Sequence, residues 1–139
     1  MEKQFDNFDL IDLINSKYFK FKKVNEEVWN NSYNISITNS EWSVIYLIYG
    51  KQPTISEIAK QVDITRQATH KCIKTLNSKG IITINNVVNS NKKKGLKLTP
   101  LGEKLYSENK LLKESLERDL AAKIGFDTVS LLKSLLANL

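Results

Sequence analysis

The amino-acid sequence predicts a mainly α-helical protein that carries one small β-hairpin, in one compact chain. Apolar residues recur at spacings of three, four and seven in several segments, as they do on one face of an α-helix. Two Thr-x-x-Glu sequences match the capping box that begins a helix. β-Branched residues form two short runs on either side of the polar, lysine-rich sequence NSNKKKG, which is typical of a hairpin.

The composition narrows the class of protein. A chain of 139 residues with 41% hydrophobic and 26% charged residues is typical of one globular domain. No apolar run approaches the roughly 20 residues that a membrane span needs. Acidic residues interrupt the apolar N-terminal segment, which argues against a secretory signal. The single cysteine cannot form an internal disulfide, so we expect a cytoplasmic protein.

The first part of the chain is predicted to form two helices. A long helix over about residues 5–31 contains no Gly or Pro. Its apolar series consists of Phe8, Ile11, Ile14, Tyr18, Phe21 and Val28. A second helix begins where Thr38 and Glu41 can cap each other's backbone amides, and it ends at Gly50.

The central segment is predicted to hold two closely linked helices and the hairpin. Thr54 and Glu57 begin a short helix that ends near residue 62. A tight link leads to Thr65, a favourable N-cap, and the next helix runs to Lys79, before Gly80. Two such helices followed by a basic hairpin describe a winged helix-turn-helix, in which the second helix enters the major groove of DNA.

The last part of the chain restarts as helix at Thr99-Pro100 and is interrupted at Gly125. Two leucine-rich stripes follow these starts: Leu101, Leu105, Leu112, Leu116 and Leu120, and then Val129, Leu132, Leu136 and Leu139. The terminal helices are more apolar than the central domain needs for its own core. We therefore expect dimerisation helices at 1–36 and 100–139 around a DNA-binding domain at 37–99. In a twofold dimer, the two copies of the helix that enters the major groove would lie about 34 Å apart.

The net charge of +6 is concentrated in the centre of the chain. Residues 51–100 contain ten Lys or Arg and two acidic residues, a net charge of +8, whereas the other 89 residues sum to −2. Such a concentration indicates a surface that faces a polyanion, although a solvated basic face is the alternative.

We call the helix that runs from Thr65 to Lys79 the reading helix, because it is the one predicted to enter the major groove. Its apolar and polar residues lie on different faces. At 100° per residue, Thr69, Cys72, Ile73 and Leu76 share one face. The other positions, which we predict to contact DNA, are Thr65, Arg66, Gln67, His70, Lys71 and Lys74. Arg66 can pair with guanine and Gln67 with adenine, while the lysines attract phosphate irrespective of sequence.

Three stretches of the chain resemble the MarR family of bacterial transcription regulators. They are SITNSEWSVIYLI, TISEIAKQVDITRQATHKCIKTLNSKGII and LKLTPLGEKL, the last similar to the family's Leu-Thr-x-x-Gly motif. The resemblance implies a homodimer that binds a pseudo-palindromic operator in double-stranded DNA. Repression is the expected outcome, because a bound dimer blocks the polymerase.

The hairpin, which forms the wing of the predicted winged helix-turn-helix, departs from that family's pattern. Ser90 and Lys92 occupy the positions of the family's Asp-x-Arg motif, so lysine replaces the planar guanidinium that suits a narrow minor groove. Lys93 and Lys94 can supply attraction to phosphate in its place. The resemblance therefore implies that Ser90, Lys92, Lys93 and Lys94 contact DNA, with weaker reading of the minor groove.

The resemblance also implies a site for a small aromatic ligand that releases the DNA. Aromatic residues that could line such a cleft, or simply form core, are Trp29, Tyr33, Trp42, Tyr46 and Tyr49. A winged helix that binds a protein partner instead of DNA is the alternative function. Its reading face would be apolar.

His70 and Cys72 are the only histidine and the only cysteine. Two residues apart on a helix, they point about 200° away from each other and cannot chelate one ion. Cys72 is expected to be a buried apolar residue, or alternatively an oxidation-sensitive thiol. With no Gly-rich phosphate loop and no metal-ligand spacing, we expect no cofactor, no metal and no enzymatic activity.

Overall fold

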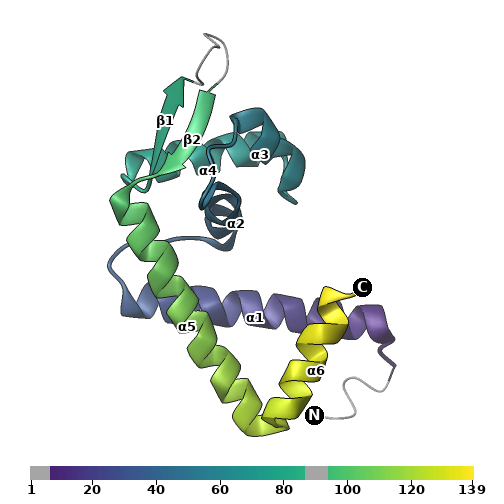
Figure 1. Cartoon of the computed structure of the whole chain (residues 1–139). Helices are drawn as coiled ribbons and strands as arrows, with labels where there is room; N and C mark the ends of the chain where they lie inside the picture. Colours follow the sequence, from purple (N-terminus) through teal and green to yellow (C-terminus); the bar gives the residue numbers. More distant parts are fainter. Residues whose placement is uncertain (1–6, 87–93) are drawn as a thin grey trace.

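The computed structural model describes residues 7–86 and 94–139, and these form six helices and one two-stranded antiparallel sheet (Figure 1). The elements are α1 (Leu10–Ser32), α2 (Asn39–Ile48), α3 (Ile55–Gln61), α4 (Arg66–Ser78), β1 (Ile82–Asn86), β2 (Lys94–Leu98), α5 (Pro100–Ile124) and α6 (Phe126–Ala137). The predicted class, mainly α with a small hairpin, is confirmed. Helices α2 to α4 and the hairpin gather at one end, and α1, α5 and α6 extend away from them.

The predicted helix starts at Thr38, Thr54 and Thr65 are confirmed by their caps. The Thr38 hydroxyl accepts from the Glu41 amide while the Glu41 carboxylate accepts from the Thr38 amide, at 3.2 and 3.0 Å. Thr54 and Glu57 form the same reciprocal pair. The Thr65 hydroxyl accepts from the Ala68 amide at 3.0 Å and so begins α4. Local sequence chemistry therefore sets these boundaries.

The predicted start of the first helix, near residue 5, is wrong. Helix α1 begins at Leu10, because Asp9 and Asp12 form a capping box of their own, with bonds of 2.9 and 3.2 Å. Phe8 precedes the helix, and residues 1–6 lie outside the described part of the chain. Asp-x-x-Asp satisfies the same orphan amides as Thr-x-x-Glu, so this boundary was readable from the sequence.

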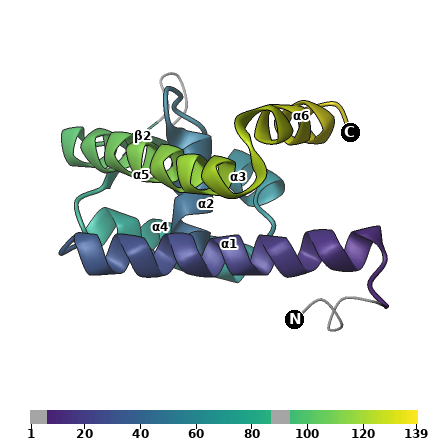
Figure 2. The same cartoon turned by 90° about the horizontal axis from the view of Figure 1, so that it is seen from below.

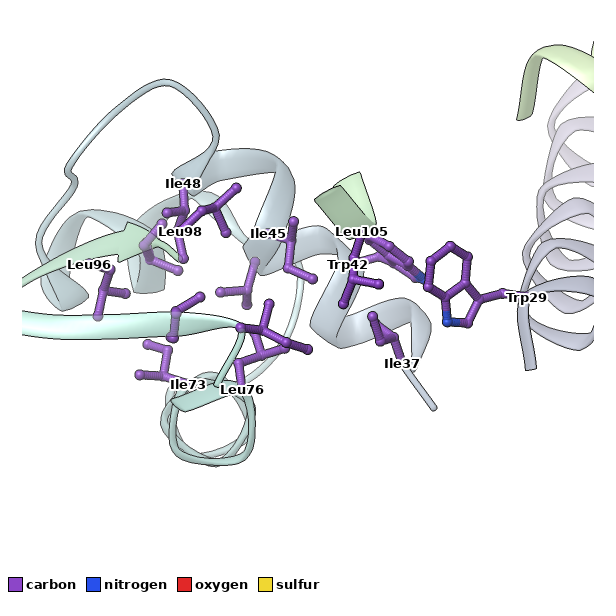
Figure 3. Packing of buried hydrophobic residues seen from close by; sticks show 14 residues of the cluster. Trp29, Ile37, Trp42, Ile45, Ile48, Ile73, Leu76, Leu96, Leu98 and Leu105 are labelled. Atoms are coloured by element: carbon purple, nitrogen blue, oxygen red, sulfur yellow. The ribbon is translucent and has the colours of Figure 1, made fainter. Parts of the chain in front are cut away.

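The hydrophobic core lies between α2, α4 and the hairpin (Figure 3). Its members on these elements include Ile45, Ile48, Ile73, Leu76, Leu96 and Leu98, each no more than 5% exposed. Trp29 of α1 and Trp42 of α2 continue the core toward the long helices. The indole of Trp29 donates to the Ile35 carbonyl oxygen at 2.8 Å, so its one polar atom is satisfied.

The hairpin is attached to the helix-turn-helix as well as to itself. Strands β1 and β2 pair in the register Ile82 with Leu98 and Ile84 with Leu96. The Leu96 amide also donates to the Pro53 carbonyl oxygen at 2.8 Å, and Thr54 forms a β-bridge with Gly95. The segment immediately before α3 therefore acts as a short third edge of the sheet.

The junction between β2 and α5 explains the Leu-Thr-x-x-Gly sequence. The Thr99 hydroxyl accepts from the Gly102 amide at 3.0 Å and lies 2.6 Å from the Gly80 carbonyl oxygen, to which it can donate. A Cβ atom on Gly102 would overlap the carbonyl oxygen of Ile81. Threonine and glycine at these positions let the first turn of α5 close on the end of α4.

Two helical faces at the far end of the molecule carry exposed apolar side chains. On α1 they include Leu10 and Ile11, which are 69% and 63% exposed. On α6 they are Phe126 and the four leucines Leu131, Leu132, Leu135 and Leu136. Helix α6 folds back from the end of α5 but is set apart from α1 (Figure 2). Within the described residues, no helix is long and apolar enough to cross a membrane.

Candidate nucleic-acid interface

Helix α4 is held in place by one narrow buried face. Thr69, Ile73 and Leu76 are at most 3% exposed, and the Thr69 hydroxyl donates to the Thr65 carbonyl oxygen at 2.9 Å. That bond satisfies the one polar atom on this face. The predicted buried face of the helix is therefore buried, with Cys72 at its edge and half-buried.

The opposite face of α4 is open to solvent. All six positions that we predicted to contact DNA are exposed: Thr65, Arg66, Gln67, His70, Lys71 and Lys74. The Thr65 oxygen accepts the capping bond, which leaves its hydroxyl proton able to bond a phosphate. The structure thus presents cationic and hydrogen-bonding groups together on the first three turns of one helix.

The wing carries further cations. Lys94 is the first residue of β2, and its ammonium donates to the Asn86 side-chain oxygen across the hairpin at 2.6 Å. The prediction that the whole stretch NSNKKKG separates the two strands is therefore wrong at Lys94, because cross-strand pairing already begins there. Ser90, Lys92 and Lys93 lie outside the described residues. Lys97, exposed on β2, is an additional cation that the sequence analysis did not single out.

The five predicted cleft aromatics come together at the junction of α1, α2 and α5. Trp29 stacks on Tyr33 with ring centroids 4.0 Å apart and meets Trp42 edge-on at 4.9 Å. Trp42 lies 6.1 Å from Tyr46. Tyr106 of α5 completes the row, because it stacks on Tyr49 at 3.8 Å and meets Tyr46 at 5.9 Å.

Tyr106 was not predicted, because it lies 57 residues from Tyr49 and no local pattern links the two. Trp29 and Trp42 are core, at 0% and 2% exposed, whereas Tyr46 and Tyr49 are 38% and 45% exposed. The aromatic row therefore leads from the core to the surface. A ligand cleft at this row stays a prediction.

Polar groups accompany the aromatic row. The fully buried Asn109 donates its amide to the Tyr46 hydroxyl at 2.8 Å. The Asn109 side-chain oxygen and the Trp42 indole nitrogen are buried and have no hydrogen-bond partner among the described residues. The Tyr33 hydroxyl donates to the Glu108 carboxylate at 2.5 Å, and this bond to the neutral phenol raises the pKa of Tyr33.

Cys72 and His70 lie on different sides of α4. Burial, followed by the nearby Glu41 carboxylate, raises the pKa of the Cys72 thiol, against smaller opposing effects of Lys71 and Lys79. Because the thiolate is the reactive form, a raised pKa favours the structural interpretation of this cysteine. The described part of the chain contains no group of three or more His, Cys, Asp or Glu residues that could hold a metal ion.

Comparison with known protein families assigns the chain to one of them. The family described as the DnaD N-terminal domain matches residues 24–117, which span α2 to β2 and parts of α1 and α5. No curated protein matched the chain.

Solved structures extend the similarity to the whole chain. A mutant of MarR from E. coli superposes with a TM-score of 0.82 at 22% identity, covering 96% of this chain and 97% of MarR. FabT of Streptococcus pneumoniae, in complex with DNA, gives 0.76 at 15% identity, covering 93% and 91%.

NadR in complex with 4-hydroxyphenylacetate gives a TM-score of 0.70 at 25% identity, covering 93% of this chain and 89% of NadR. Two further neighbours of this fold, BldR from Sulfolobus solfataricus and a MarR/EmrR family protein from Acinetobacter, are described as transcriptional regulators. The resemblance to the MarR family is confirmed in the fold. The chain belongs to the family of the DnaD N-terminal domain, and over nearly its whole length it has the fold of the MarR regulators.

Proposed function

We propose that this protein is a sequence-specific regulator of transcription that binds double-stranded DNA as a homodimer and reads it with α4. The observation that carries the proposal is the exposed face of α4, where cations and amide groups gather opposite a fully buried apolar face. The neighbouring Lys94 and Lys97 of the hairpin extend the positive surface. Repression by blocking the polymerase is the outcome that we propose for binding at a promoter.

Different exposed groups on α4 can supply sequence preference and general affinity for DNA. Arg66 can donate two hydrogen bonds to guanine O6 and N7, and Gln67 can bond both N6 and N7 of adenine. Lys71 and Lys74 can neutralise phosphates, which adds affinity without sequence preference. Structures of FabT with DNA and of a MepR mutant with an oligodeoxyribonucleotide support the same use of this fold.

Replacing Arg66 by alanine is expected to weaken binding of the preferred site by about 1–3 kcal/mol and to relax its sequence preference. The reason is that a bidentate contact to one base is lost while the phosphate contacts remain. Lys92→Ala is the matched control, which should weaken all sequences evenly and reduce the salt dependence. Electrophoretic mobility shifts with selected and random duplexes, at low and high salt, measure both effects.

Two outcomes would contradict the proposal. Unchanged affinity and preference in Arg66→Ala would mean that α4 does not read DNA. A protein that shows no salt-sensitive shift with any duplex would favour the alternative, a winged-helix adaptor for a protein partner.

The uncovered apolar faces of α1 and α6 support the homodimer. Side chains such as Leu131 and Leu135, 60% and 57% exposed, form a continuous stripe on α6 that nothing in the described chain covers. Exposed patches of this kind mark interaction surfaces. A second copy related by a twofold axis buries the same faces on both chains and sets two α4 helices toward a pseudo-palindromic operator.

Release by a small aromatic ligand completes the proposed function. The Trp42 indole and the Asn109 side-chain oxygen are a donor and an acceptor that are buried without partners, and both adjoin Tyr46. Buried polar groups are almost always satisfied, so their state favours a polar guest at this junction. The complex of NadR with 4-hydroxyphenylacetate supports a ligand of that chemistry.

Adding 4-hydroxyphenylacetate is expected to change the tryptophan fluorescence and to dissociate the DNA. Both tryptophans of the chain lie in the aromatic row, so their emission reports on this junction. Asn109→Leu, which removes the unsatisfied oxygen at similar volume, should weaken the effect at least about tenfold, because a ligand hydrogen bond is lost. An unchanged titration in that variant would argue against a site at Asn109.

A further inference from the structure

The C-terminal end of α4 is tied to the segment that connects α1 to α2. Lys79 is the C-cap of α4, and its ammonium donates to the Ser36 carbonyl oxygen at 2.6 Å. The same ammonium lies 3.3 and 3.4 Å from the two carboxylate oxygens of Glu41. Lysine therefore places its donors on two partners at the entry to α2.

The carboxylate of this ion pair is more deeply buried than the side chain that carries the ammonium. Glu41 is 4% exposed, and the side chain of Lys79 is 30% exposed. A buried carboxylate is strongly unfavourable once its partner is removed. One oxygen of Glu41 also accepts from the Thr38 amide, so the same carboxylate caps α2 and holds Lys79.

The packing of α4 on α2 is largely apolar. The contacts that seat α4 on α2 are made by side chains such as Ile45 and Leu76, and hydrophobic attraction is not directional. The ion pair adds a directed contact at the end of α4 that is far from the DNA-reading residues.

We propose that Lys79 and Glu41 are positioning residues that lock the orientation of α4 relative to α2 and to the segment that joins α2 to α1, and thereby fix the half-site spacing that the dimer accepts. The proposal rests on the function proposed above. Each α4 is tied to the start of α2, where the Asn39 side chain in turn donates to the Lys22 carbonyl oxygen and the Glu26 carboxylate of α1 at 3.0 and 2.8 Å. Because α1 belongs to the proposed dimer interface, an error in the orientation of α4 occurs twice across the twofold axis. The spacing of half-sites mirrors the distance between the two reading helices.

Two substitutions separate this role from capping and from direct phosphate contact. Glu41→Gln keeps a side chain that can cap Thr38 but removes the negative charge that holds Lys79. It leaves every cation in place, so a loss of phosphate contacts cannot explain its effect. Lys79→Met keeps the apolar stem and removes the ammonium, and Lys79→Arg restores the charge.

The experiment is selection of bound duplexes from a random library, followed by affinity measurements on the selected site with spacers changed by one base pair. The wild-type dimer should bind a site with its preferred spacing at least about tenfold more tightly than a site whose spacer differs by one base pair. A wrong spacing should thus cost about as much as a mismatched base pair. Glu41→Gln and Lys79→Met should select the same half-site but reduce that preference to about threefold or less, with recovery in Lys79→Arg.

The outcomes are distinct. A spacing preference that is unchanged in Glu41→Gln would overturn the lock. Evenly weaker binding at all spacings in Lys79→Met alone would assign Lys79 to a phosphate and would also overturn it. Failure of the wild-type protein to select paired half-sites would overturn the proposed function, and the lock with it. Circular dichroism and thermal melting establish whether each variant is folded. If Lys79→Met does not fold, Glu41→Gln alone carries the test.

Discussion

Replacing Gly102 by alanine is expected to lower the free energy of unfolding by about 2–3 kcal/mol, the cost typical of overpacking. The added methyl group would overlap the carbonyl oxygen of Ile81, a backbone atom that cannot turn aside as a side chain can. Either α5 moves away from the end of α4, or the Thr99 cap opens. Urea denaturation followed by circular dichroism measures the loss.

Helix propensity makes the opposite prediction for this substitution. Alanine is favoured over glycine inside a helix by about 1 kcal/mol, so without the overlap Gly102→Ala would stabilise α5. Ser107→Ala, at an exposed position one and a half turns further along α5, is the control and should leave the stability within about 0.5 kcal/mol. Equal stability of the two variants would mean that the contact with Ile81 does not limit this position.

Replacing Leu136 by glutamate is expected to raise the dissociation constant of the dimer at least about a hundredfold. Burying one leucine contributes about 1.5–3 kcal/mol, and a twofold interface loses that contribution twice. The new carboxylate also resists transfer out of water. Sedimentation or light scattering over a dilution series measures the change.

Ser130→Glu is the matched control, because it adds the same charge at an exposed position on the side of α6 opposite the leucine stripe. It should leave the dimer intact, and it should leave DNA binding intact as well. A dissociation constant that is the same for Leu136→Glu and the wild type would contradict the proposed use of α6. A wild-type protein that is monomeric at micromolar concentration would remove the homodimer from the proposal.

Features governed by neighbouring residues were predictable from the sequence. The caps at Thr38, Thr54 and Thr65 depend on partners three residues away, and the two faces of α4 follow from helical periodicity alone. Asp9 obeys the same rule and was missed only because the preceding apolar residues continue the helical pattern.

Features that join distant segments were not predictable. Lys79 meets Glu41 across 38 residues, and Tyr106 meets Tyr49 across two helices and the hairpin. The sequence contains no local pattern for either contact, because each depends on how α2, α4 and α5 pack. The constraint on Gly102 is of the same kind, since the oxygen that excludes a side chain belongs to Ile81.

The bond from Leu96 to Pro53 and the bridge from Thr54 to Gly95 have a mechanical consequence. They join β2 to the turn before α3, so we expect the described strands, α3 and α4 to move together. In the proposed complex with DNA, we expect a change among the long helices to shift β2 and the reading helix together. Contacts of the hairpin and of α4 with DNA should then be gained or lost together within one half-site.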